Sequence, residues 1–325
     1  MRKRSAPASS RLVRLAAVFV VALVSACGTA AAPDAYDRLT TTTKVAWDPI
    51  QVNVGLTIRA GGETIEVDPS AIAVVFDGAA TKTGLHVALP ADDLRLDPGE
   101  LDRLGFAGDS VDVDVVYDGR KLYARSALLG STLRTILGPS GKVPPGDLAG
   151  WLGFGSEGEF AALSNLLGMN PTGRSSDPAA SAPPATAAAL KQTLEAAGIT
   201  LTSAGVQPHD GSAAFHVAIA IDSDQLVASP FFDARTRTQL GQLGVSVQAF
   251  TFSGDVWLDP GGSRIVEIDL HVVSIAHPSE GGDIRITFRD PDGSVSLAPP
   301  PSFVDVPLGA LITEMTRLIG TGAES

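Results

Sequence analysis

The sequence is poor in cysteine, in aromatic residues and in basic side chains. Its single cysteine, Cys27, excludes an internal disulfide, so packing alone must stabilise the folded chain. Aromatic residues make up 6% of the chain against 44% hydrophobic residues in total, so its apolar surface is mainly aliphatic. Asp and Glu outnumber Lys and Arg by 36 to 24, which argues against nucleic acid as a partner because such a surface repels phosphate backbones.

The N-terminal apolar run is also short. Residues 15–26 form a run of twelve residues that follows five basic side chains. As a helix it would span about 18 Å against a hydrocarbon core of about 30 Å, too short for a transmembrane helix. This pattern predicts a signal peptide over residues 1–26. Without that segment the chain has 19 basic and 36 acidic residues, a net charge of −17, so an anchor in the membrane must come from lipid.

The end of this run resembles the lipobox of bacterial lipoproteins. An aliphatic residue and two small residues precede Cys27, and Gly28 follows it. The resemblance implies cleavage before Cys27, a diacylglycerol on its thiol with acyl chains such as palmitate, and a place on the outer face of the cell membrane. The alternative is secretory cleavage after Ala26, which would leave a free thiol.

Composition predicts how the exported part is organised. Residues 27–44 have few large apolar side chains, so we expect a flexible tether from the lipidated cysteine. Residues 45–325 then form a single domain in two halves, 45–168 and 186–320. A Pro/Ser/Ala linker over residues 169–185 joins the halves.

Alternating apolar and polar residues predict strands in local hairpins in both halves. In the clearest hairpin, residues 111–125, we expect a type I′ turn at Asp118 and Gly119 that places Val115 opposite Leu122 and Val113 opposite Ala124. The other strands are expected at 51–59, 64–67, 72–76, 84–89, 199–202, 213–221, 245–258, 264–275 and 283–289.

Helical patterns lie between the strands and at the C-terminus. They are expected over residues 127–137, after Ser156, over 186–197, from Ser229 to about 243, and over 306–319. The last shows an apolar stripe and is expected to lie on the sheet. Since no βαβ alternation is present, the pattern predicts an α+β fold with an antiparallel sheet.

No catalytic or metal-binding set stands out, so we expect no enzyme activity, no cofactor and no metal. Residues 153–158 fit G-x-G-x-x-G but lack the βαβ context, so they predict a loop before a capped helix. The five histidines show no HxH or HExxH spacing. Three of them, His86, His216 and His271, lie mid-strand opposite the apolar side chains, where a solvated side chain is expected. Residues 222–224 are expected to form a surface turn.

One-sided aliphatic strands are the main feature of the sequence. A curved sheet closed by helices can leave such a face incompletely packed and able to hold apolar ligands. A fully packed core is the alternative, which periodicity does not exclude. The candidate cavity residues are Leu85, Val87, Val113, Val115, Leu122, Phe215, Val217, Ile219, Val256, Ile268 and Leu270.

The order of several motifs resembles the LppX/LprAFG family of actinobacterial cell-envelope lipoproteins. The motifs are the lipobox, the segments 117–123, 194–198 with 210–211, and 256–259, and the final Pro299-Pro300-Pro301. The resemblance implies a LolA-like half-barrel of antiparallel strands covered by helices. It also implies a hydrophobic cavity that carries an acylated lipid or glycolipid within the cell envelope. The linker and the C-terminal helix depart from the family pattern.

Two other functions remain open from the sequence. The first is a structural or signalling envelope lipoprotein with a packed core, which acts through a protein partner of unknown identity and has no lipid ligand. The second is a hydrolase whose catalytic residues follow no recognised motif.

Overall fold

The computed structural model describes most of the chain beyond the expected tether, namely residues 35, 36, 39, 49–78, 80, 82–90, 110–156, 186–230, 246–262 and 264–321. Cys27, the linker, and the helices expected after Ser156 and Ser229 lie outside these residues. Two compact units divide the chain, and their division does not follow the halves of the sequence. Unit 1 includes residues 54–69 together with 175–288, whereas unit 2 includes 48–53, 70–174 and 289–325.

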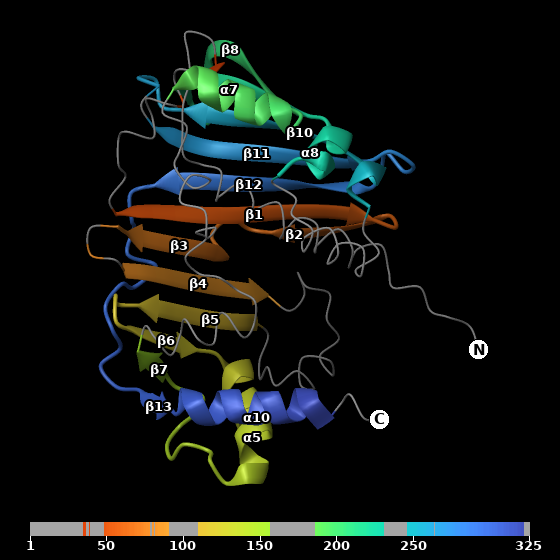
Figure 1. Ribbon diagram of the computed structural model, residues 1–325. Coiled ribbons are helices and arrows are strands. Elements are labelled where there is room, and N and C mark those ends of the chain that lie inside the picture. Colours follow the sequence, from red (N-terminus) through yellow and green to blue (C-terminus); the bar gives the residue numbers. More distant parts are fainter. Residues whose placement is uncertain are drawn as a thin grey trace, which may run out of the picture. The chain divides into compact units, whose positions relative to one another are not determined.

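Unit 1 contains the strands that follow the linker except β13, together with β2 and most of β1 (Figure 1). Its hydrogen-bonded strand order is β1-β12-β11-β10-β9-β8, and β2 pairs with β1. Three short helices accompany them among the described residues. The bounds are β1 (Ile50–Ala60), β2 (Glu63–Val67), α7 (Ala187–Ala196), β8 (Ile199–His209), β9 (Ser212–Ile221), α8 (Ser223–Ala228), η2 (Val247–Ala249), β10 (Phe250–Leu258), β11 (Ile265–Ser274) and β12 (Gly281–Arg289).

Unit 2 contains the earlier hairpins and the C-terminal helix. Its strand order is β13-β7-β6-β5-β4-β3, continued by the first residues of β1. The bounds are β3 (Ile72–Asp77), β4 (Lys82–Pro90), β5 (Ser110–Tyr117), β6 (Lys121–Arg125), α5 (Ala127–Leu137), η1 (Gly138–Ser140), β7 (Leu152–Ser156), β13 (Val304–Val306) and α10 (Leu308–Thr321).

Hydrogen bonding joins thirteen strands into one sheet. The pairs β1–β2, β1–β3, β3–β4, β4–β5, β5–β6, β6–β7, β8–β9, β9–β10, β10–β11 and β11–β12 are antiparallel, whereas β13 and β7 pair in parallel. The strand path has two ends, β13 and β8, so the sheet is open, as a half-barrel requires. The expected α+β class with an antiparallel sheet is therefore confirmed.

The β5–β6 turn differs from its expected position by one residue. Val115 lies opposite Ala124, and Tyr117 opposite Leu122, so the expected pairings of Val115 with Leu122 and of Val113 with Ala124 were both wrong. The turn has Gly119 at its first central position with φ +90°, as a type II′ turn requires, while the Asp118 side chain accepts hydrogen bonds from the backbone N–H groups of Arg120 and Lys121. The apolar side chains keep their common face because the pairing moved by two residues.

Two other segments are more regular than expected. Residues expected as a glycine-rich loop form strand β7, where Gly153 leaves room for the side chains of Phe303 and Lys121. The expected surface turn at residues 222–224 is the start of α8, and Asp222 is its N-cap, which accepts from the backbone N–H of Asp224. Both expectations were wrong. Strand β7 forms because β6 and β13 pair with it, which local sequence does not show, whereas the start of α8 rests on the local cap by Asp222.

A buried cluster in unit 2 joins both of its helices to the sheet. It contains Leu133 and Leu137 of α5 and Leu308 and Leu311 of α10, packed with residues of β6 and β7. In Figure 1, α5 and α10 lie together beside β13. The C-terminal helix therefore forms where its stripe predicted, two residues later than expected.

Residues 290–303 form a strap on the other face of unit 2, which the sequence did not predict. Val295 and Leu297 pack on Ala73 and Val75 of β3. A Cβ at Gly84 would lie 2.6 Å from the Ser296 carbonyl oxygen, so only glycine fits beneath the strap. This face of the sheet is thereby closed.

Part of the expected tether packs on unit 1. Ala35, Tyr36 and Leu39 are helical and buried. The Tyr36 hydroxyl accepts a hydrogen bond of 2.9 Å from the backbone N–H of Leu201 in the edge strand β8. This contact satisfies a backbone donor that an edge strand leaves unpaired.

Candidate functional site

One face of unit 2 carries aliphatic side chains in register across three strands. Val87 lies opposite Ile72 on one side and Val113 on the other, and Leu85 has the same relation to Val74 and Val115. All of these side chains are half-buried. With Leu122 of β6 they form a continuous surface, called here the aliphatic face: Ile72, Val74, Leu85, Val87, Val113, Val115 and Leu122.

The opposite face of the same strands is more deeply buried. Val75, Val116 and Tyr123 are each at most 6% exposed there, and the strap covers Val75. The usual expectation is that the more aliphatic face is the better buried one. Here the reverse holds, so unit 2 keeps apolar surface on its aliphatic face that its strap does not cover.

Helices border one side of the aliphatic face. Val115 and Leu122 pack against the buried cluster that α5 and α10 share. Leu85, Val87 and Val113 are not among the residues that pack on this cluster. The five candidate cavity residues of unit 2 therefore do lie together, with a helical border.

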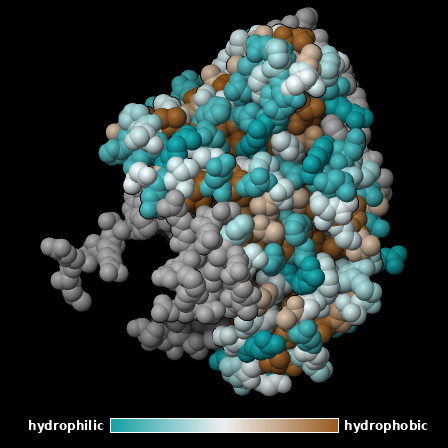
Figure 2. Space-filling model, turned by 180° about the vertical axis from the view of Figure 1, so that it is seen from behind, coloured by the Kyte–Doolittle hydropathy of each residue, from teal (hydrophilic) through white to brown (hydrophobic). Residues whose placement is uncertain are grey.

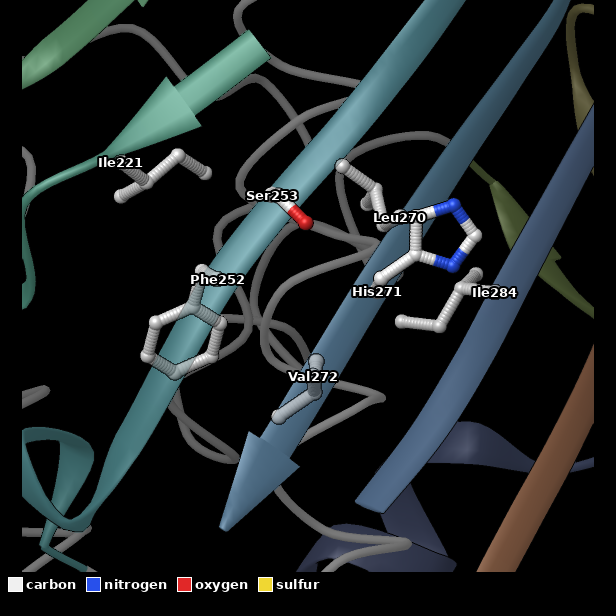
Figure 3. A pocket seen from close by; sticks show the side chains of 7 residues that line it. All are labelled: Ile221, Phe252, Ser253, Leu270, His271, Val272 and Ile284. Atoms are coloured by element: carbon white, nitrogen blue, oxygen red, sulfur yellow. The ribbon is translucent and has the colours of Figure 1, made fainter. Parts of the chain in front are cut away.

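The six candidate cavity residues of unit 1 lie together as well but are packed as a core. Their exposed fractions are at most 8%: Phe215, Val217, Ile219, Val256, Ile268 and Leu270. The hollow beside Leu270 encloses about 190 Å³ and leaves no space for the centre of a water molecule. Figure 3 shows its lining side chains on β9 to β12, with Ser253 and His271 among them. This hollow therefore offers no room for an acyl chain.

The histidines of the polar face lie within hydrogen-bonding distance of carboxylates, so the expectation that they are simply solvated was wrong. In unit 2, His86 Nδ1 lies 2.8 Å from Asp114 Oδ1. In unit 1, His216 Nε2 lies 2.5 Å from Asp255 Oδ1, and His271 Nδ1 lies 2.8 Å from Asp283 Oδ1. The cause is register, because antiparallel pairing places each histidine beside an acid of a neighbouring strand.

In unit 1 these pairs join into a chain across five strands. Asp255 also lies 3.5 Å from His271 Nε2, and Asp283 Oδ2 accepts a 2.6 Å hydrogen bond from Arg59 of β1. Burial alone would raise the pKa of Asp283, but hydrogen bonds from Arg59 and His271 lower it below its ordinary value. The chain therefore holds the strands together through side chains as well as through the backbone.

His209 is the centre of a second polar cluster, which the sequence did not single out. Its Nε2 lies 3.2 Å from Glu267 Oε1 and 3.9 Å from Asp210 Oδ2. Arg285 Nη2 lies 2.7 Å from Glu267 and 2.9 Å from Asp210. Burial raises the pKa of Glu267 to about 7, and Asp269 also raises it while Arg285 lowers it.

Three atoms of this cluster are close enough to share one cation. The ligand atoms of His209, Asp210 and Glu267 all lie within 4.8 Å of one another. The guanidinium of Arg285 already pairs with both carboxylates and so supplies the positive charge that a metal ion would bring. The arrangement therefore suits an ion-pair network, and the strand pairing that creates it could not be read from the sequence.

Two open hollows lie elsewhere on the surface. One holds about 490 Å³ near the start of α10 in unit 2, where Lys121 pairs with Asp305. The other holds about 440 Å³ beside Glu195 and Asp222 in unit 1. Figure 2 shows hydrophilic and hydrophobic residues interspersed over the visible surface. Among the described residues, no helix combines the length and hydropathy needed to cross a membrane.

Comparison with known proteins returns likeness of fold only. No family model matches the chain, and no curated protein matches its sequence. Among solved structures it is similar to the lipoprotein LppX of Mycobacterium tuberculosis, with 11% identity, 88% of this chain and 99% of that chain covered, and a TM-score of 0.33. LprF from Mycobacterium bovis shares 13% identity over 82% of this chain and 96% of its own, with a TM-score of 0.35.

A more distant likeness is to a LolA superfamily protein from Nitrosomonas europaea, with 11% identity, 91% and 96% coverage and a TM-score of 0.19. LppX and LprF carry the names of the family that the sequence resembles. At these identities and TM-scores the function must be argued from the residues of this chain.

Proposed function

We propose that this protein is a membrane-anchored lipoprotein that binds or carries an acylated lipid or glycolipid in the cell envelope. The observation that supports this most is the aliphatic face of unit 2. Its seven half-buried side chains are contiguous, in register and without a charged member. Each methylene of an acyl chain removed from water against such a surface contributes about 0.8 kcal/mol.

The anchor is the second part of the proposal. The lipobox-like sequence before Cys27 favours a diacylglycerol on the only thiol of the chain. A protein held at the membrane has a lipid source within reach, which complements a surface suited to acyl chains. We propose a carrier without enzyme activity, on the outer face of the cell membrane.

Lipid binding is tested with a soluble form that starts at residue 28. Native mass spectrometry should show co-purified lipid, and a fluorescent fatty acyl probe should bind after delipidation. Val113→Trp, which fills the aliphatic face, should weaken probe binding about tenfold or more while the melting temperature changes little. The matched control is Val206→Trp, at a position 62% exposed in β8, which should leave probe binding unchanged.

A protein that purifies empty and does not bind the probe would refute the carrier function and favour the structural or signalling alternative. The anchor is tested separately in the full chain. Cys27→Ser should move the protein from the membrane fraction to the soluble fraction and remove labelling by an alkyne analogue of palmitate. Retention at the membrane without that thiol would contradict the lipid anchor.

A further inference from the structure

The tip of the β8–β9 hairpin contacts a strand that is not its neighbour in the sheet. β8 is the edge strand of unit 1, and both β9 and β10 lie between it and β11. Three strand spacings amount to about 14 Å in a flat sheet. The side chains of His209, the last residue of β8, and Glu267 of β11 bridge this distance over the polar face, with His209 Nε2 3.2 Å from Glu267 Oε1.

The backbone of the β8–β9 hairpin has two special features, a bulge in β8 and a tight turn at its tip. The β8–β9 register shifts between Ser203 and Gly205, and such a bulge bends a strand. At the tip, Asp210 and Gly211 both have positive φ, +44° and +79°, as a two-residue type I′ turn requires. The exposed Asp210 carboxylate then pairs with Arg285 of β12 at 2.9 Å. Two contacts thus hold the tip, one to β11 and one to β12.

The contact of His209 with Glu267 of β11 is less exposed to solvent than the contact of Asp210 with Arg285 of β12. The Glu267 side chain is 4% exposed and that of His209 is 16% exposed. The His209 ring stacks on Trp257 with 4.1 Å between ring centroids and 10° between planes, which fixes the orientation of the imidazole. The charged and titratable groups around the pair are Asp210, Arg285 and Asp269, and His216 stacks on the same tryptophan.

The acidic groups of this cluster outnumber its positive charge while Glu267 is ionised. Without a proton on Glu267, the carboxylates of Asp210, Glu267 and Asp269 surround the single positive charge of Arg285. A proton on Glu267 removes one of these three negative charges. A buried carboxylate left without this proton is costly.

We propose that His209 and Glu267 form a proton-operated latch that holds the β8–β9 hairpin tip on the polar face of unit 1 and releases it as the pH rises. The raised pKa of Glu267, about 7, sets the direction. A carboxyl group whose pKa is higher in the closed form favours that form below its ordinary pKa. This contribution is lost as the pH rises toward 7 and above. The latch does not depend on the proposed lipid ligand.

Hydrogen–deuterium exchange of the full chain tests the latch between pH 5.5 and 8.5. After correction for intrinsic exchange rates, peptides covering residues 206–213 should lose at least about tenfold of their protection over this range. Peptides from β10 and β11 should change little. Equal protection of the tip at all pH values would overturn the proposal without any variant.

Substitutions separate the latch from a general effect of pH. Glu267→Gln keeps a neutral hydrogen-bonding side chain, so the tip should stay protected throughout the range. His209→Phe keeps a ring on Trp257 but removes both nitrogens, so the tip should exchange rapidly at every pH. The control His271→Phe alters another histidine of the same face and should leave the pH dependence of the tip intact. A Glu267→Gln protein with the wild-type pH dependence would refute the latch.

Discussion

Single polar side chains hold the strap of unit 2 in place. Gln51 is fully buried, and its Oε1 accepts a 3.0 Å hydrogen bond from the backbone N–H of Asp292. Its Nε2 donates to Asn53 Oδ1 at 3.1 Å and to Ser294 Oγ at 3.3 Å. Gln51 and Asn53 are buried although they are polar, because these hydrogen bonds satisfy them beneath the strap.

Replacing Gln51 should therefore destabilise the protein. Gln51→Leu removes the acceptor of the Asp292 N–H in a buried place, which should cost about 1 to 3 kcal/mol in the free energy of unfolding. Urea denaturation measures it. Gln207→Leu is the matched control, because Gln207 bonds only the nearby Ala204 carbonyl at the surface, and its effect should stay within about 0.5 kcal/mol. Equal effects of both would contradict the role of Gln51.

At the scale of elements, two helical glycines of unit 2 have opposite surroundings. A Cβ at Gly130 of α5 would lie 2.2 Å from the Leu148 carbonyl oxygen. A Cβ at Gly309 of α10 would meet nothing within 4 Å. The first glycine thus permits a close approach of backbone to helix, whereas the second only lowers the helix propensity.

The same substitution should therefore act in opposite directions. Gly309→Ala should raise the melting temperature, in line with about 0.5 to 1 kcal/mol of added helix propensity. Gly130→Ala should lower it, because overpacking costs about 1 to 3 kcal/mol and outweighs the same gain. Scanning calorimetry compares the two variants directly. Stabilisation by both would show that α5 can move away from Leu148 at little cost.

At the scale of the whole molecule, the two units treat their aliphatic strands differently. Val217 of unit 1 is 0% exposed among other buried side chains, whereas Val113 of unit 2 is half-buried. The sequence patterns of the two strands are alike, and both residues were candidates for the same cavity. Their surroundings indicate a solid core in unit 1 and an accessible apolar surface in unit 2.

Tryptophan at each position should separate these two surroundings. Val217→Trp should lower the free energy of unfolding by about 1 to 3 kcal/mol or more, because the core has no space for the larger ring. Val113→Trp should change it by less than about 1 kcal/mol. Urea denaturation followed by circular dichroism measures both. A tolerated Val217→Trp would indicate unfilled space in unit 1 and extend the lipid-binding proposal to that unit.

The sequence by itself determined the elements whose cause is local. The hairpins, the helix over residues 127–137 and the helix that ends at Gly198 follow from alternation, helical spacing and turn residues, all within a few positions of one another. It also supplied the antiparallel class and the one distinctive thiol, Cys27.

Only the tertiary structure decided which faces are covered. Burial depends on what packs against a strand, and the strap on β3 and β4 comes from more than 200 residues later in the chain. The same reason explains the His209 cluster, because a histidine of the edge strand meets a β11 carboxylate across two intervening strands. Hydrophobic periodicity and composition predict each strand. Pairing between residues far apart in the sequence decides which neighbours a strand has, and these neighbours make it core, ligand surface or latch.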